Sequence, residues 1–379
     1  MSLEPIFPRV NFKSRKEFMD FLEDMMAASV EEEAEAEVIE ETRGRPREMK
    51  TYIMESNNGL PKIRTATSLI AFQSPTDLPE ISVLKLEYEG KSAVFYIDAS
   101  DPRFLVLYTN DLADITDPLY TRLVNSTSNY FDKIWLPTKM LDKISQLTGN
   151  AFRGFGLMFD DLFAQQEPEE QPIHELRMNV SGASSAEALE ALSDKKDLRR
   201  SLSRSMVRVR RGNKTTFVAD ELRFTGRFIT KTGTSSEDHV SLVETTRKLY
   251  RNLIEEVERS SIGAKRVEER TLIEGQAFDL VLEREIEDIG LFAAKLLTPD
   301  APFRLWGLRN KVSQEMSQII AVDLHTGDPI DLEITTSLIR IYLPKGACGN
   351  TVLRLYTNLQ HSFDSTIRFN DEKLLAIDS

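Results

Sequence analysis

Hydrophobic residues at helical spacing predict two long amphipathic helices. The first is expected from about Arg15 to Ser29, where Ser14 and Glu17 have the capping-box spacing that lets each side chain satisfy the other's free backbone donor. The second follows Ser236 and ends near Gly263. The apolar faces consist of Phe18, Phe21, Leu22, Met25 and Met26 in the first helix, and of Val240, Val243, Leu249, Tyr250, Leu253, Ile254 and Val257 in the second.

Shorter apolar and alternating runs predict antiparallel strands in both halves of the chain. Ile81–Glu87 and Ala93–Asp98 flank Gly90 as a hairpin, and further helices are expected at Leu119–Tyr130 and Thr138–Leu147. An antiparallel meander of four C-terminal strands is expected at Gln318–His325, Pro329–Thr335, Leu338–Leu343 and Thr351–Thr357. The sequence therefore predicts an α+β fold, with two domains of antiparallel sheets and flanking amphipathic helices.

Local composition suggests where the chain divides. Residues 31–41 hold seven glutamates, and such a self-repelling run predicts an acidic mobile segment near the N-terminus or a frayed extension of the first helix. Residues 165–172 have almost no apolar content, which is typical of a linker. The expected segments are 1–50 (N-terminal helix and an acidic and basic flexible stretch), 51–164 (an α+β domain), 165–183 (linker), 184–270 (a basic helix–hairpin–helix region) and 271–379 (a β-rich region).

Overall charge and cysteine content narrow the class of protein. The chain has 379 residues, a formal net charge of −13 and a single cysteine, which excludes an intramolecular disulfide and a cysteine-based zinc cage. It contains no run of about 18 apolar residues and no apolar stretch of the secretory type at its N-terminus. We therefore expect a cytoplasmic protein that has no cofactor and does not enter a membrane.

The central region runs against this acidic background. The stretch from Lys195 to Lys214 contains nine basic residues and only one acidic residue, Asp197. Further basic residues follow in the next alternating run. We expect a helix over Ala186–Met206, then strands that continue its cationic surface. The candidate nucleic-acid-binding residues are Lys195, Lys196, Arg199, Arg200, Arg204, Arg208, Arg210, Arg211, Lys214, Arg223, Arg227 and Lys231.

Clustered lysines and arginines bind phosphate backbones and gain affinity by releasing counterions. Two other interpretations stay open for this cluster: a solvated charged surface, or neutralisation of the protein's own acidic segments. His239, in the first turn of the second long helix, is expected at the surface or in a capping role rather than in catalysis.

A carboxylate and histidine cluster on the predicted C-terminal hairpin offers an enzymatic alternative. Asp323, His325, Asp331 and Glu333 share one parity, and a three-residue turn would place Asp323 opposite Asp331. Such a group could hold Mg²⁺ or Mn²⁺ for phosphodiester hydrolysis. The solvated face of a half-buried sheet explains the same alternation without a metal, and we favour it.

The sequence thus favours a non-catalytic binding or assembly protein that contacts DNA or RNA through a central basic helix and hairpin. The alternatives are a metal-dependent phosphodiesterase and a structural subunit that binds an acidic protein surface. A protein partner is expected in either binding role.

Overall fold

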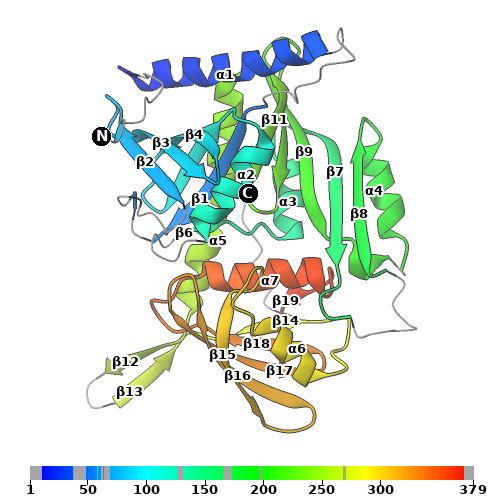
Figure 1. Cartoon of the computed structure of the whole chain (residues 1–379). Coiled ribbons are helices and arrows are strands. Elements are labelled where there is room, and N and C mark those ends of the chain that lie inside the picture. Colours follow the sequence, from blue (N-terminus) through cyan, green and yellow to red (C-terminus); the bar gives the residue numbers. More distant parts are fainter. Residues whose placement is uncertain are drawn as a thin grey trace. The chain divides into compact units, whose positions relative to one another are not determined.

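The computed structural model describes residues 11–36, 48–57, 59–60, 63, 69–125, 131–164, 173–196, 198–267 and 270–370 (Figure 1). Its helices are α1 (Arg15–Ala36), α2 (Ala113–Val124), α3 (Thr138–Ser145), α4 (Ser185–Ser193), α5 (Ser236–Ser260), α6 (Ile289–Leu296) and α7 (Asn350–Ser362). Its strands are β1 (Lys50–Ser56), β2 (Ile70–Pro75), β3 (Ile81–Tyr88), β4 (Lys91–Asp98), β5 (Phe104–Thr109), β6 (Phe131–Lys133), β7 (Asn150–Asp160), β8 (Glu175–Ser181), β9 (Arg204–Gly212), β10 (Phe217–Arg223), β11 (Arg227–Gly233), β12 (Gly263–Val267), β13 (Arg270–Glu274), β14 (Phe278–Val281), β15 (Leu305–Lys311), β16 (Met316–Asp323), β17 (Pro329–Thr335), β18 (Leu338–Tyr342) and β19 (Arg368–Phe369). This content, with its antiparallel strand pairs, confirms the predicted α+β class.

The chain divides into two compact units, each made of several stretches of sequence. Unit 1 comprises Met1–Ile134, Leu147–Ala151 and Arg208–Arg247, and unit 2 comprises Trp135–Gln146, Phe152–Val207 and Lys248–Ser379. The sequence composition suggests domains that follow one another along the chain. In the structure, each unit instead combines stretches that are far apart in sequence. The basic central region is itself divided, because the boundary falls between Val207 and Arg208 within β9.

Unit 1 is built on a sheet of antiparallel hairpins with helices on both faces. The strands follow the order β2-β3-β4-β5-β1-β11-β10-β9, and β6 also pairs with β1. Tyr52 pairs with Leu107 of β5 and Arg227 of β11, so these three side chains share one face, while Thr51 and Tyr108 share the other.

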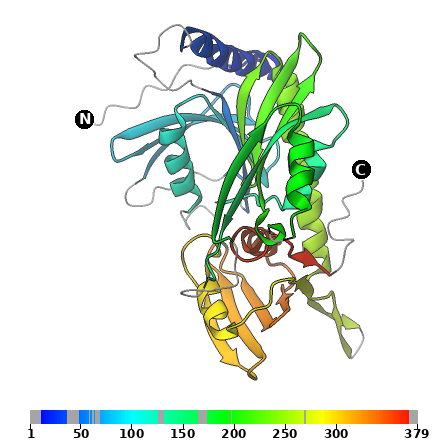
Figure 2. The same ribbon diagram turned by 90° about the vertical axis from the view of Figure 1, so that its right-hand side faces the viewer.

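The two faces of this sheet carry different helices. The ring of Tyr120 in α2 lies 4.3 Å from that of Tyr52, which places α2 on the Tyr52 face. The ring of Phe18 in α1 lies 5.7 Å from that of Tyr108, which places α1 on the opposite face (Figures 1 and 2). The apolar stripe that predicted α1 is therefore buried against the sheet, as expected for an amphipathic helix.

Unit 2 contains a second antiparallel sheet, in the order β15-β16-β17-β18-β14-β19. A cluster of aromatic rings contributed by α6 and neighbouring loops belongs to its core: Phe292 lies 4.3 Å from Phe163 and 5.0 Å from Phe363. All thirteen residues of α7 are buried. The β12–β13 hairpin extends from this unit and leaves Ile273 81% exposed.

One predicted strand is a helix. Residues 351–357 were expected to complete the C-terminal meander, yet they lie within α7. The strand prediction rested on residues 351–357 alone, whereas the helical spacing of Val352, Leu355, Tyr356 and Leu359 becomes visible only when Leu359 is included. The other three predicted strands correspond to β16, β17 and β18.

The central and N-terminal predictions also need correction. The expected helix over residues 186–206 ends at Ser193 in α4, and the chain continues through a 3-10 turn at Arg199–Ser201 into β9. The expected linker over 165–183 contains β8, while its residues 165–172 lie outside the described residues. Helix α1 continues to Ala36, so the first part of the acidic run is helical and the rest lies outside the described residues.

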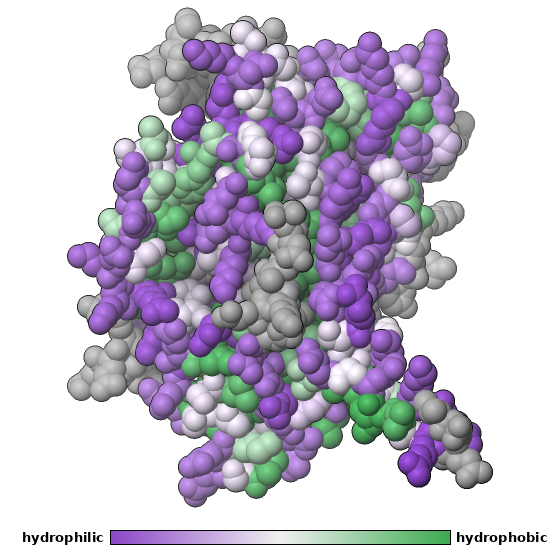
Figure 3. Space-filling view, turned by 180° about the vertical axis from the view of Figure 1, so that it is seen from behind, coloured by the Kyte–Doolittle hydropathy of each residue, from purple (hydrophilic) through white to green (hydrophobic). Residues whose placement is uncertain are grey.

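On the face shown in Figure 3, the described surface is mostly hydrophilic, and hydrophobic residues gather there in limited patches. Among the helices that the structure describes, none combines the length and the apolar composition needed to cross a bilayer.

Candidate functional site

A buried carboxylate gathers several of the predicted cations in unit 1. Glu221 of β10 accepts hydrogen bonds from Arg208 of β9 at 3.0 Å and from Arg223 at 3.1 Å. Lys231 of β11 adds a further positive charge nearby and pairs with Glu48 at 2.7 Å. Burial alone would raise the pKa of Glu221, but these three cations hold its pKa below the ordinary value. Glu221 is therefore a fixed anion around which the cations are arranged.

Three more predicted residues lie in or beside the β9–β10 turn: Arg210 and Arg211 at the end of β9, and Lys214 in the turn. Arg210 lies over the ring of Phe217, 4.2 Å from its centroid, and donates to the carbonyl of Asn213 at 2.6 Å. Arg211 approaches Asp238 to 4.0 Å, and Lys214 is exposed at the turn itself. The three cations thus lie at or next to an exposed turn.

Arg227 extends this arrangement toward α2. Its guanidinium pairs with Asp117 of α2 at 2.6 Å. Five of the predicted residues therefore lie on three adjoining strands, and we call them the cationic face: Arg208, Arg210, Arg223, Arg227 and Lys231. Their carboxylate partners are Glu48, Glu221 and Asp117, which leaves the group with a net charge of +2.

The remaining predicted cations belong to unit 2. Lys195 and Lys196 are exposed, and Arg199 pairs with Glu283 at 3.0 Å. Arg200 donates to the carbonyl of the same Glu283 residue at 3.1 Å. Arg204 is buried and pairs with Asp142 at 2.9 Å, so it serves packing in unit 2. The expectation of one continuous cationic helix and hairpin is therefore corrected, because the helix ends before these arginines and the cations are divided between two units.

The structure does not bring together the four predicted metal ligands. Ile320 pairs with Asp331, and the backbone N–H of Asp323 donates to the carbonyl of Asp328, so the turn is longer than expected. Asp323 consequently lies on the buried face of β16, whereas Asp331 and Glu333 lie on the partly exposed face of β17. The expected shared face is wrong, since the observed pairing is shifted by three residues, and a shift by an odd number moves side chains to opposite faces.

Asp323 is committed to a buried ion pair rather than to a metal. Arg354 of α7 donates to it, and the hydroxyl of Thr351 donates at 2.5 Å. Burial would raise the pKa of Asp323, but Arg354, Thr351 and the backbone N–H of His325 hold it below its ordinary value. On the other face, Glu333 accepts a hydrogen bond from Tyr342 at 2.8 Å. Two of the four residues thus have structural roles that account for their positions.

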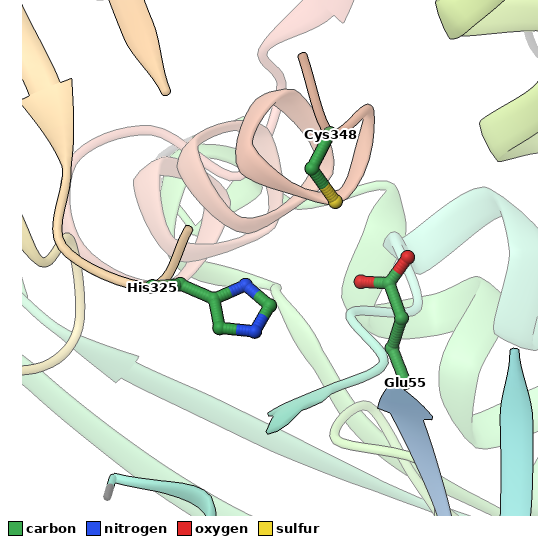
Figure 4. Close-up of side chains that lie close together, drawn as sticks. All are labelled: Glu55, His325 and Cys348. Atoms are coloured by element: carbon green, nitrogen blue, oxygen red, sulfur yellow. The ribbon is translucent and has the colours of Figure 1, made fainter. Parts of the chain in front are cut away.

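His325 also lies near the protein's single cysteine. Ligand atoms of His325 and Cys348 in unit 2 come within 4.8 Å of each other, and both side chains are buried (Figure 4). Two ligands do not form the set of three or four that zinc sites use. Glu55, the third labelled residue, belongs to unit 1 and pairs there with Arg103 at 2.8 Å.

A buried histidine network in unit 1 has no signal in the sequence. His239 is fully buried, which corrects the expected surface position, and its Nδ1 lies 2.8 Å from Asp220. Its Nε2 lies 2.8 Å from the hydroxyl of Thr51. A carboxylate, an imidazole and a hydroxyl thus follow one another as they do in the catalytic triad of a hydrolase. Thr51 has no exposed surface, so a substrate cannot reach that hydroxyl. The network ties β1, β10 and α5 together.

The fold and these contacts define an α+β protein with cations clustered on one antiparallel sheet. The chain belongs to the MJECL33-like protein family, whose profile matches residues 8–375. A relative from Methanocaldococcus jannaschii, named Uncharacterized protein MJECL33, is 30% identical over 401 aligned positions, covering 95% of this chain and 94% of the relative. With both chains covered almost completely, the two proteins are expected to share both units.

Proposed function

We propose that this protein binds a polyanion, with nucleic acid as the favoured class, through the cationic face of unit 1, and that it performs no chemistry there. The supporting observation is the sharing of Glu221 by Arg208 and Arg223. One carboxylate cannot neutralise two guanidinium groups, and the exposed part of Arg223, 46% of its side chain, is available to a phosphate. Such a role is compatible with a cytoplasmic location.

The strands support this role by holding the cations in fixed positions. Arg208 and Arg223 are anchored on Glu221, and Arg210 is anchored over Phe217, so little side-chain entropy remains to be lost on binding. A preorganised set of donors on adjoining strands suits a repeating phosphate backbone. The existing ion pairs oppose binding, because each phosphate must compete with a carboxylate already present.

The test is the salt dependence of oligonucleotide binding. Single-stranded DNA, double-stranded DNA and RNA would be titrated into the full chain, and into the double variant Arg210→Ala/Arg223→Ala, across a range of salt concentrations. We expect weaker binding in the variant and a salt slope smaller by about one to two units, because roughly 0.9 counterions are released per phosphate contact. Lys195→Ala/Lys196→Ala removes the same charge from unit 2 and serves as the matched control.

Equal loss of affinity in the two double variants would show that total charge, rather than the cationic face, governs binding. An absence of oligonucleotide binding at low salt would contradict the proposal outright. An acidic protein surface would then be the partner to test.

A further inference from the structure

A small pocket opens in unit 1 where α2 meets the end of the cationic face. Its volume is about 160 Å³, and three cations line it: Lys133 of β6, Arg223 of β10 and Arg227 of β11. Typical pockets for whole small molecules measure about 300–1,000 Å³. This pocket therefore suits a single polar group rather than an entire nucleotide.

The charge of the lining favours a dianion. Asp117 is its one carboxylate, and both of that side chain's oxygens already have partners within the pocket wall. Oδ1 accepts from the hydroxyl of Tyr52 at 2.7 Å, and Oδ2 lies 2.6 Å from the guanidinium of Arg227. Three cations and one anion leave the lining with a net charge of +2.

The tyrosines in the wall add no negative charge. Tyr52 and Tyr120 line the pocket with their rings 4.3 Å apart. Burial raises the pKa of both phenols above their ordinary values, so they stay neutral. Their rings also support the cations, with Arg227 5.8 Å from the Tyr52 centroid and Lys133 6.0 Å from the Tyr120 centroid.

Arg227 is the most buried of the three cations in the pocket wall. The residue is only 8% exposed, and its guanidinium is held by Asp117 at 2.6 Å. Its Nε–H group is buried, so an oxyanion in the pocket would contact the other donors of the guanidinium. The hydroxyl groups of Thr121 and Thr225, which also line the pocket, can donate to the same anion.

We infer that this pocket binds one phosphate group, either as inorganic phosphate or as the terminal group of a phosphomonoester. A phosphate matches the size, the charge and the set of donors. The inference does not require a polyanion, since the pocket accommodates one group and its lining includes Lys133, which lies outside the cationic face.

Calorimetric titration of the full chain tests this inference with two probes, inorganic phosphate and ribose 5-phosphate. Saturable binding of one or both is expected, with at least a tenfold weaker Kd in Arg223→Gln and in Lys133→Gln, because each variant removes a charged donor. Arg227→Gln is expected to abolish binding, and its fold is checked by circular dichroism. The exposed Lys195→Gln in unit 2 is the matched control and should bind like the unaltered protein.

The two probes distinguish the sources of the phosphate. Tighter binding of ribose 5-phosphate assigns the pocket to a phosphomonoester, and tighter binding of inorganic phosphate assigns it to the free ion. Saturation by neither probe at millimolar concentration, or identical affinities in Arg223→Gln, Lys133→Gln and Lys195→Gln, would overturn the inference. If the protein binds oligonucleotides but not phosphate, only the phosphate-pocket inference is overturned. If it binds phosphate but not oligonucleotides, only the polyanion proposal is overturned.

Discussion

Replacing Arg354 by methionine should destabilise unit 2 strongly. Arg354 has no exposed surface, and it pairs with Asp323, which is equally buried. Its Nε also donates to the carbonyl of Phe303 at 3.1 Å. Methionine fills much of the same volume, so the main effect of Arg354→Met is an uncompensated carboxylate in the interior. Breaking a buried pair in this way costs about 3–5 kcal/mol of unfolding free energy.

This effect should depend on pH with a defined sign. In the unaltered protein Arg354 helps to hold the pKa of Asp323 below its ordinary value, so the pair stabilises the fold above about pH 4 and loses that contribution as pH falls through the lowered pKa. In Arg354→Met, burial of the carboxyl, which is the largest influence on its pKa, is opposed only by the hydrogen bonds from Thr351 and the His325 N–H, so the protonated form gains population. The stability difference between the two proteins should therefore be largest near neutral pH and should narrow on acidification.

Tryptophan fluorescence provides the assay, because both tryptophans, Trp135 and Trp306, belong to unit 2. Urea unfolding of Arg354→Met would be compared with that of Arg340→Met, since Arg340 pairs with Asp279 at 2.7 Å but is 41% exposed. The exposed pair should contribute at most about 1 kcal/mol. The double variant Asp323→Asn/Arg354→Met should recover part of the loss. Equal destabilisation by Arg354→Met and Arg340→Met would refute this reasoning.

Three further changes have defined outcomes. Gly226→Ala should lower the melting temperature of unit 1, since Gly226 has φ +73° and an added Cβ would lie 2.2 Å from Cγ1 of Ile134, an atom that Ile134→Val retains, so adding that exchange should not restore the loss. Burial lowers the pKa of His361 to about 4, so urea unfolding followed by tryptophan fluorescence should show stability falling by up to about 3 kcal/mol as pH drops from 6.5 to 4, and His361→Gln should weaken that dependence. Thr51→Val should cost about 1–3 kcal/mol in thermal or urea unfolding by leaving His239 without its hydroxyl partner, whereas a loss below 0.5 kcal/mol would contradict a structural role for the network.

Local patterns predicted much of the fold correctly. The predicted helix at residues 138–147 corresponds to α3, and the hairpin around Gly90 corresponds to β3 and β4. Each of these elements is specified by residues close together in sequence, either as an amphipathic period or as a turn. The strand expected at residues 351–357 is wrong because the helical spacing of the apolar residues in α7 extends to Leu359, beyond that short window.

The candidate site was predictable only in part, because charge partners are not local. The sequence identifies the cations, yet Lys231 finds Glu48 across 183 positions. The pocket draws its lining from four separated stretches, represented by Tyr52, Asp117, Lys133 and Arg227. The hydrophobic periodicity of a sequence does not predict such long-range side-chain contacts, because they depend on strand order and register.

Photocrosslinking to an oligonucleotide, followed by mass spectrometry of the linked peptides, tests the central claim most directly. We predict that cross-links concentrate in residues 208–233, which contain the β9–β10 turn and Phe217 beneath Arg210. Arg210→Ala/Arg223→Ala should reduce their yield. Cross-links confined to peptides of unit 2, such as those that contain Lys195 and Lys196, would contradict the assignment of binding to the cationic face.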